Sequence, residues 1–224
     1  MLTFYYNPFS PNVRRVWLTL LEKNIPFEPI LIELNGDQLQ PEFLSVNPFY
    51  HIPAIVDDGF RVIESLAILD YLEAKYPTPS LLPIEAQGIA IVRMTQMLTA
   101  NELFPAIVSL IYESEAAPQY EQARQRVDQV LMFMAELLGN RSYFGGDQLT
   151  LADIVVGAAI PLLPQLNFSL TPYPQINDWY QRVMNREAWQ KTQMDEERFE
   201  VFKRRVKVLV RLRRRSLTAG SAKQ

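Results

Sequence analysis

Two serines in this sequence stand where hydroxyl groups can take part in chemistry. Ser10 opens the segment SPNVRRVWLTLLEK, and Ser65 opens an apolar periodic segment that runs to about Leu72. Serine is a preferred helix N-cap, so both serines mark expected helix starts. At Ser10 the following proline strengthens this, because proline is common at the first helical position. The start of a helix offers unpaired N–H groups and a positive dipole end, and the one at Ser65 therefore suits a carboxylate. The alternative at both positions is a plain helix cap without a ligand.

The residues that are missing exclude several classes of chemistry. The 224 residues contain no cysteine and a single histidine, His51. Structural disulfides, thiolate zinc sites, dithiol redox chemistry, a cysteine nucleophile and multi-histidine metal sites are therefore excluded. A Ser-His-Asp triad would have to be built around His51. Neither a G-x-x-x-x-G-K nor a G-x-G-x-x-G motif occurs, so nucleotide hydrolysis and hydride transfer lack their usual sequence support.

The first 76 residues predict a small α/β domain that would position both serines. Gly59 supplies the positive φ that a tight hairpin turn requires, and Pro53 stands at the first residue of a strand, where proline is tolerated. The order strand, helix, strand at the N-terminus predicts a parallel pair. We expect strands over residues 2–6, 27–34, 53–56 and 60–63, and helices over residues 10–23, 41–44 and from 65 onward.

A proline-rich stretch, PTPSLLP, separates this part from a purely helical remainder. We predict domains over residues 1–77 and 85–224 with a linker over residues 78–84. The second domain is expected to be a helical bundle. Its helices are predicted at about 85–112, 119–138, 150–163, 173–186 and 195–215.

Composition predicts a compact cytoplasmic protein. Apolar residues make up 48% of the chain, which is enough for a proper core. The chain starts without a basic-then-apolar leader, and its longest apolar run, residues 154–163, is too short to span a bilayer. We therefore expect a soluble, cytoplasmic location.

Several segments together resemble the cytosolic glutathione transferases. FYYNPFSPNVRRV, PEFLSVNP, HIPAIVDDG and VIESLAILDYL look like the thioredoxin-like domain of that family, and YFGGDQLTLADIVV resembles its sixth-helix motif. The resemblance implies an α/β thioredoxin-like N-terminal domain followed by an all-helical C-terminal domain. In the last motif, Thr150 and Asp153 have the spacing of a capping box, so we interpret Asp153 as structural.

The family's reaction is attack by the thiolate of glutathione on an electrophile. A free thiol has a pKa of about 8.5, so such a protein must favour the anion. The resemblance to serine-type transferases (theta, delta and phi, with a cyanobacterial chi-like class as the finer expectation) assigns this task to the Ser10 hydroxyl. Tyr6 is the alternative, because Tyr6-Asn7-Pro8 resembles the Tyr-x-Pro of tyrosine-type transferases.

The resemblance also implies contacts to the first two parts of glutathione. Ile52, which precedes Pro53, resembles the residue whose backbone pairs with the cysteinyl moiety. Glu64 and Ser65 resemble the pair that holds the γ-glutamyl end, with the serine at the carboxylate and the glutamate at the ammonium group.

Around the glycine end of glutathione the chain departs from the family pattern. Gln38 and Tyr50 stand where delta and theta relatives commonly have histidine, and His51 stands where zeta and phi relatives often have glutamine. Gln38 and His51 are therefore expected contacts, with a solvent-facing role as the alternative for His51.

For the electrophile, the sequence offers a stripe in the helical domain. Asn101, Phe104, Ile107, Val108 and Ile111 have helical spacing and would lie on one face, although core packing explains such a stripe as well. The same alternative applies to Met94, Met97, Met132 and Met134. The candidate pocket residues are Phe9, Asn101, Phe104, Ile107, Val108 and Ile111.

The C-terminal segment is strongly basic. Residues 198–224 carry ten Lys and Arg against one acid, a net charge of +9, whereas residues 1–197 carry 12 against 24, a net charge of −12. Phe199, Phe202, Val206 and Leu209 keep helical spacing, so a terminal helix is expected to pack over the active site while RLRRR faces water. The open alternatives are a solvated helix that neutralises an acidic body, and contact with an anionic membrane or nucleic acid.

Together these features predict an enzyme that conjugates glutathione to small hydrophobic electrophiles in detoxification. The resemblance implies glutathione as co-substrate, no metal, and a homodimer. The alternative is a non-catalytic binding or scaffold protein with the transferase fold. Retention of Ser10, Pro53, Glu64 and Ser65 as a set favours the enzyme.

Overall fold

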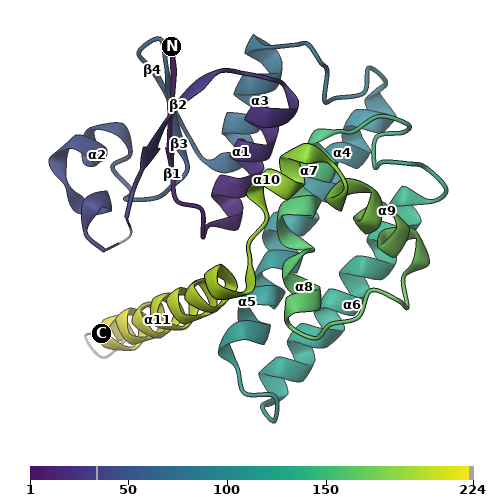
Figure 1. Cartoon of the computed structure of the whole chain (residues 1–224). Coiled ribbons are helices and arrows are strands. Elements are labelled where there is room, and N and C mark those ends of the chain that lie inside the picture. The colour runs from purple at the N-terminus through teal and green to yellow at the C-terminus, as the bar shows by residue number, and fades with distance from the viewer. Residues whose placement is uncertain (34, 222–224) are drawn as a thin grey trace.

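A computed structural model describes residues 1–33 and 35–221 and has a sheet domain beside a helical domain (Figure 1). The sheet has the strand order β2-β1-β3-β4. β1 is parallel to β2 and antiparallel to β3, which confirms the predicted parallel pair. The second strand was expected to reach Leu34, which lies outside the described residues, and it ends at Leu31. The strands are β1 (Leu2–Tyr6), β2 (Phe27–Leu31), β3 (Ala54–Asp57) and β4 (Phe60–Ile63).

Helices cover both faces of this sheet, as in a thioredoxin-like domain. On one face, Phe4 of β1 is buried in the main core with the apolar sides of α1 and α3. On the other face, Phe43 of α2 is buried with Ile32 and Ala54 in a smaller core. The helices of this domain are α1 (Pro11–Glu22), the short 3₁₀ helix η1 (Asp37–Leu39), α2 (Pro41–Val46) and α3 (Ser65–Lys75).

The hairpin between β3 and β4 turns at Asp58 and Gly59, as the sequence predicted. Both residues have positive φ, 50° and 84°, which matches the right-handed twist of the flanking strands. The turn leads through β4 directly into α3, so it fixes the position at which that helix starts.

From residue 86 onward, helices form the second domain. α7 is buried along its whole length, and Thr150 and Asp153 form the predicted capping box at its start. The helices are α4 (Ala86–Leu98), the π-helical turn η2 (Thr99–Leu103), α5 (Phe104–Tyr112), α6 (Pro118–Leu138), α7 (Leu151–Ala159), α8 (Leu162–Gln165), α9 (Pro174–Met184), α10 (Glu187–Thr192) and α11 (Glu196–Ser221).

Two of the predicted helices are interrupted where proline occurs. Pro105 has no N–H to offer, and its ring crowds the preceding turn, so the expected helix 85–112 passes through the π-helical turn η2. The expected helix 150–163 stops at Ala159 because Pro161 follows. The short helix α10 was not predicted. The last three residues of the predicted second domain, 222–224, lie outside the described residues.

α1 lies between the two domains and contacts α3 on one side and α7 and α10 on the other (Figure 1). Arg14 donates from Nε to Thr192 Oγ1 at 3.2 Å, and Glu22 forms an ion pair with Arg186 at 2.6 Å. Because α1 is held from both sides, its first turn is fixed where the domains meet.

Candidate active site

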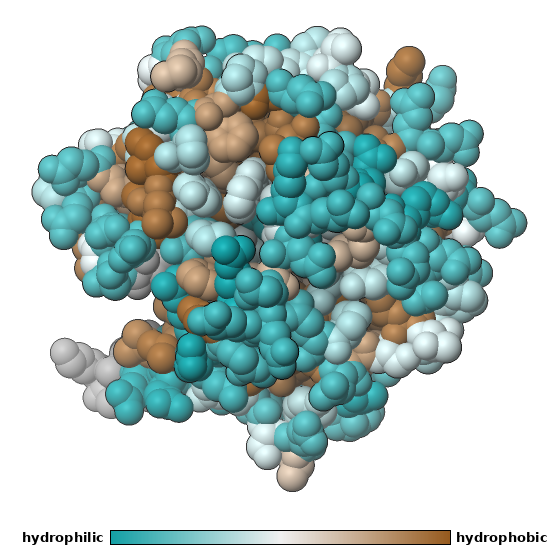
Figure 2. All heavy atoms as spheres, viewed as in Figure 1, coloured by the Kyte–Doolittle hydropathy of each residue, from teal (hydrophilic) through white to brown (hydrophobic). Residues whose placement is uncertain are grey.

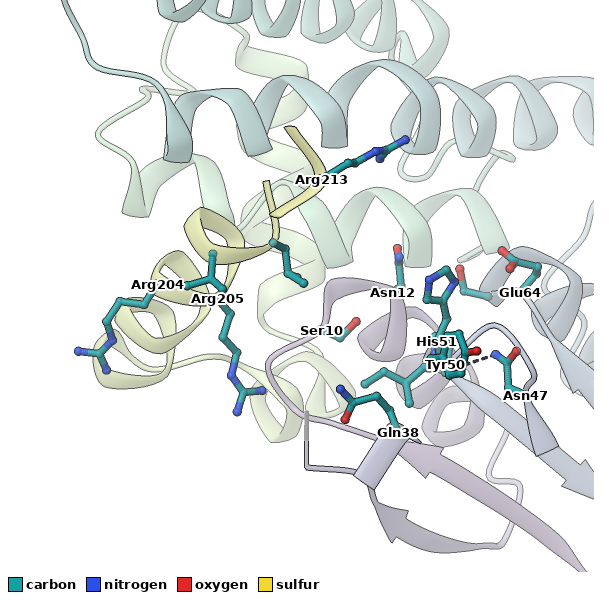
Figure 3. A pocket seen from close by; sticks show the side chains of 15 residues that line it. Ser10, Asn12, Gln38, Asn47, Tyr50, His51, Glu64, Arg204, Arg205 and Arg213 are labelled. Carbon is teal, nitrogen blue, oxygen red and sulfur yellow. Dashed lines mark hydrogen bonds between the residues drawn. The ribbon is translucent and has the colours of Figure 1, made fainter. Parts of the chain in front are cut away.

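A cavity of about 740 Å³ opens between the N-terminal domain and α11. The surface is visibly hollowed between these two parts (Figure 2), and the side chains around the hollow are drawn in Figure 3. We call it the Ser10 cavity. Every residue that the sequence suggested for glutathione lines it, namely Ser10, Gln38, His51, Ile52, Pro53, Glu64 and Ser65, and Asn12, Asn47 and Tyr50 complete this side.

Ser10 caps α1, as its place before Pro11 predicted. Its Oγ accepts a hydrogen bond from the Val13 N–H at 3.4 Å, which is a long bond. A hydroxyl that accepts at its oxygen still has its own hydrogen to donate. Ser10 is half-buried at the cavity wall, so this hydrogen and the positive end of α1 act on the same region.

Tyr6, the alternative to Ser10, lies elsewhere. Its ring packs against the rings of Phe4 and Trp17, with 5.6 Å between centroids in each case. It is not among the residues that line the Ser10 cavity. Of the two candidates for activating the thiol, Ser10 borders the cavity and Tyr6 does not.

The start of α3 differs from the prediction in one detail. Ser65 was expected to cap the helix, but it is the first helical residue, and Glu64 occupies the N-cap position with φ of 67°. No side chain caps the first turn, because the Ser65 Oγ instead accepts a hydrogen bond from Arg15 Nη1 at 3.2 Å. The first N–H groups of α3 and the Ser65 hydroxyl hydrogen therefore remain as donors, a combination suited to a carboxylate.

Arg15 supports the site through Ser65 without lining the cavity itself, and no role was predicted for it. It is 3% exposed, burial lowers its pKa to about 10, and its Nε has no hydrogen-bond partner in the structure. Among the described residues no carboxylate forms an ion pair with it. A buried charge is costly unless it is paired, so a ligand carboxylate at Ser65 would supply what Arg15 lacks. An arginine beside the apolar stripe of a helix normally faces solvent, so the sequence held no signal for this position.

The loop before β3 is held by a buried asparagine. Asn47 is 1% exposed, its Nδ2 donates to the His51 carbonyl at 2.7 Å, and its Oδ1 accepts from the Phe49 N–H at 3.0 Å. Tyr50 and His51 are exposed at the cavity, and the Ile52-Pro53 peptide bond is cis. No role was predicted for Asn47, although Asn-Pro dipeptides mark turns of this kind. Gln38 reaches the cavity from η1.

The predicted electrophile stripe does not line the Ser10 cavity. Ile107 and Ile111 are buried in the core, and Phe104 and Val108 pack against it. Asn101 lies in a separate hollow of about 310 Å³ on the outside of α4 and α6, which is lined by Met94, Met97, Leu98, Glu102 and Phe133. For these helix residues the structure matches the core-packing alternative and places only Asn101 at a surface hollow.

The side chains opposite Ser10 come from α11 instead. We call Arg204, Arg205, Val208, Leu209 and Arg213 the α11 wall, because all five line the cavity. As expected, the terminal helix packs over the site and buries Phe199, Phe202 and Val206. The five residues of RLRRR, 211–215, are all exposed as expected, and Arg213 among them also borders the cavity (Figure 3).

Phe9, the remaining candidate for the electrophile pocket, contacts the α11 wall. The Arg205 guanidinium lies 4.6 Å from the centroid of the Phe9 ring. Arg205 also donates to the Asn7 Oδ1 at 3.3 Å. The segment between β1 and Ser10 is therefore tied directly to α11.

In the described part of the chain, no three or more acidic or histidine side chains come together in a way that could hold a metal ion. Among the described helices, none is both long and apolar enough to cross a membrane.

Comparisons with known proteins agree with this geometry. The family descriptions "Glutathione S-transferase, N-terminal domain" and "Glutathione S-transferase, C-terminal domain" match residues 4–80 and 95–187. Glutathione S-transferase D7 of Drosophila melanogaster is 30% identical over 183 residues, which cover 80% of this chain and 82% of the relative.

Solved structures show the same fold. A delta-class glutathione transferase of Nilaparvata lugens is 28% identical with a TM-score of 0.78, and the match covers 93% of this chain and 99% of that one. An epsilon-class glutathione S-transferase of the housefly, Musca domestica, is 25% identical with a TM-score of 0.77 and covers 93% and 98%. With both family domains matched and this fold, the chain belongs to the glutathione S-transferases.

Proposed function

We propose that the protein conjugates glutathione to small hydrophobic electrophiles, with the Ser10 hydroxyl stabilising the thiolate. The observation that carries this proposal is the convergence of two helix starts on one cavity: α1 at Ser10 and α3 at Ser65. One start suits a thiolate and the other a carboxylate, which are the two anionic ends of a γ-glutamyl-cysteinyl unit.

Glutathione would lie along the cavity with its γ-glutamyl end at the start of α3 and its glycine end near η1. The γ-glutamyl carboxylate would accept from the Ser65 hydroxyl and the first N–H groups of α3, and Glu64 would accept from the ammonium group. The cysteinyl backbone would pair with the main chain of Ile52, and the glycine end would approach Gln38, Tyr50 and His51. This order brings the sulfur beside Ser10.

A hydroxyl donor and a helix N-terminus together are strong enough to ionise the thiol of bound glutathione. A hydrogen bond to a charged group contributes roughly 1.5–3 kcal/mol, and a helix N-terminus up to about 1 kcal/mol. Because one pKa unit corresponds to about 1.36 kcal/mol, these effects lower the thiol pKa by about two units. The thiol proton leaves to solvent, the sulfur forms a bond to the electrophilic carbon, and a leaving group such as chloride departs with the bonding electrons.

Conjugation assays combined with binding measurements on the full chain test this function. We expect elution from immobilised glutathione and catalysed conjugation of a halonitrobenzene or an isothiocyanate, with peroxide reduction as a further assay. Glutathione binding without catalysis on any of them would favour the scaffold alternative. An absence of binding heat in calorimetry with millimolar glutathione would overturn both.

We also propose that the protein forms a homodimer. Transferases of this family typically dimerise, and the outer faces of α4 and α6 expose several apolar side chains around the smaller hollow. These are Met94, Met97, Met132 and Phe133, which are 43%, 48%, 57% and 41% exposed. An interface across this patch would cover them.

We propose the domain limits 1–77 and 85–224, with a linker over 78–84. We also propose that the protein is cytoplasmic. Contact of the basic terminal segment with an anionic membrane or nucleic acid is the alternative to a solvated helix, and the comparisons give it no support. For the residues of the α11 wall, the position beside the cavity favours a role at the site.

A further inference from the structure

Arg15 carries a positive charge that no acid in the described part of the chain balances. Its side chain is buried, and the one hydrogen bond that this side chain makes to the described residues runs from Nη1 to the Ser65 Oγ at 3.2 Å. Its Nε has no hydrogen-bond partner. Burial alone lowers its pKa, to about 10, so the side chain stays cationic at neutral pH. A buried cation of this kind costs free energy until an anion approaches it.

Ser65 lies between this charge and the Ser10 cavity. It is 7% exposed and still lines the cavity. Because its Oγ accepts from Arg15, the hydroxyl hydrogen is left to donate. Ser65 is also the first residue of α3, whose first turn has no side-chain cap. A hydroxyl donor and uncapped N–H groups, with a buried cation behind them, form a binding site for one carboxylate.

The neighbouring Arg14 shows that burial alone does not make such a site. It is buried as well, burial lowers its pKa to about 10, and its Nη2 lacks a hydrogen-bond partner. Consecutive residues of a helix point about 100° apart, and Arg14 donates to Thr192 of α10, on the side of the helical domain. Neither Arg14 nor Thr192 lines the Ser10 cavity. The two arginines are alike in burial and differ in what they face.

We propose that Arg15 is a positioning residue for glutathione, which acts through Ser65 to make the start of α3 selective for the ionised γ-glutamyl carboxylate. This inference rests on the proposed function and adds a specificity-determining residue to it. The hydrogen bond from Arg15 fixes the Ser65 hydroxyl so that its hydrogen is directed to the ligand. The bound carboxylate then balances the charge of Arg15, so glutathione removes a free-energy cost that the unliganded protein carries.

Calorimetry on the full chain with three peptides tests the proposal. They are glutathione, its γ-glutamyl amide, in which the α-carboxylate of the γ-glutamyl residue is a carboxamide, and its glycine amide, in which the glycine carboxylate is a carboxamide. The unmodified protein should bind the γ-glutamyl amide about 10–100-fold more weakly than glutathione, as expected for the loss of hydrogen bonds to a charged group.

Arg15→Met should weaken the binding of glutathione and of the glycine amide about tenfold each, and should hardly change the binding of the γ-glutamyl amide. The selectivity against the γ-glutamyl amide therefore falls, while the ratio between the other two peptides stays the same. Arg15→Lys should keep part of the selectivity, because it retains the charge and loses the planar fork. Arg14→Met is the matched control and should change none of the three affinities.

Stability and kinetics separate positioning from a structural role. Arg15→Met should leave the free energy of unfolding of the unliganded protein unchanged or raise it, because an unbalanced buried charge is removed. Urea denaturation measures this. With 1-chloro-2,4-dinitrobenzene, KM for glutathione should rise while kcat at saturating glutathione changes little, which is the pattern of a lost binding contact. A variant that fails to fold, or that weakens all three peptides equally, would show that Arg15 is structural and would overturn the inference.

The route through Ser65 is tested in the Ser65→Ala protein, where Arg15→Met should cost much less affinity for glutathione than it does in the unmodified protein. An undiminished cost would overturn the positioning role, because Arg15 would then act on the ligand directly. If the unmodified protein binds glutathione and the γ-glutamyl amide equally well, the inference is overturned and the proposed function stands. If it binds neither glutathione nor the glycine amide, both are overturned.

Discussion

Ser10 illustrates how one hydroxyl can serve structure and chemistry together. Its oxygen caps α1 through the Val13 N–H, while its hydrogen remains available at the cavity. The cap bond is long, at 3.4 Å, so the cap contributes little that a water could not replace. Removing this hydroxyl should therefore lower the rate of the reaction much more than the stability of the fold.

Replacing Ser10 by alanine should lower kcat/KM with 1-chloro-2,4-dinitrobenzene by about 10–1000-fold, because a donor to developing or full negative charge is lost. Glutathione should still bind, since its other contacts are intact. Tyr6→Phe is the matched control and should lose little, because the Tyr6 ring packs against Phe4 and Trp17 away from the cavity. Steady-state kinetics of the two variants measure this. If the ranking is reversed, the hydroxyl that activates the thiol belongs to Tyr6.

Arg15, which holds Ser65, and Arg205, which lines the cavity, have positions that the sequence alone could not reveal. Each was part of a helix expected from its apolar spacing, in which an arginine normally points to solvent. Their roles depend on contacts made across the chain, to Ser65 for Arg15 and to Asn7 for Arg205. Such contacts are set by the packing of α1 and α11 and carry no local signal.

At the scale of elements, local signals predicted most of what positions the site. The serine and proline at residues 10 and 11, the turn at Gly59 and the capping box at Thr150 each act within a few residues, so they can be recognised in sequence. The interruptions at Pro105 and Pro161 were missed because the apolar pattern continues across each proline. In one case a π-helical turn accommodates it, and in the other a new short helix begins.

The tie between β3 and α3 gives a prediction on pH. Asp57 is buried at the end of β3, where its Oδ2 accepts from Tyr76 at 2.8 Å and Tyr71 at 3.1 Å and pairs with Lys75 at 2.8 Å. Burial acts to raise the pKa of Asp57, but these partners together outweigh it and hold the pKa below its ordinary value. Between the lowered pKa of Asp57 in the folded protein and its ordinary value in the unfolded chain, the folded protein binds fewer protons. The stability that Asp57 contributes is therefore lost as the pH falls through that interval.

Asp57→Asn should lower the free energy of unfolding at pH 7 by about 1–3 kcal/mol and should flatten its decline between about pH 5 and 3. Urea denaturation at several pH values measures both effects. Asp58→Asn, at the exposed neighbour, is the control and should change the curve much less. Parallel curves for Asp57→Asn and the unmodified protein would mean that the carboxylate contributes nothing specific.

At the scale of the whole molecule, the Ser10 cavity and the apolar patch on α4 and α6 are separate surfaces. The basic helix α11 closes over the Ser10 cavity, while the exposed methionines and Phe133 lie on the outside of α4 and α6. This division separates the site from the surface that we assign to the dimer.

The dimer proposal predicts a mass of twice 25.9 kDa in light scattering coupled to gel filtration. Met97→Glu should shift the protein toward the monomer, because a charge buried in the patch would be unpaired. Ile84→Glu, at a residue that is 95% exposed and does not line the smaller hollow, is the control and should leave the mass unchanged. A monomer at micromolar concentration in the unmodified protein would contradict the proposal.

The central claim, that the protein ionises the thiol of bound glutathione, is tested most directly by titrating the ultraviolet absorbance of the thiolate in the complex. The unmodified protein should give a midpoint near pH 6.5, about two units below the value of about 8.5 for a free thiol. In Ser10→Ala the midpoint should return most of the way to that value. A midpoint equal to that of free glutathione in the unmodified protein would contradict the account.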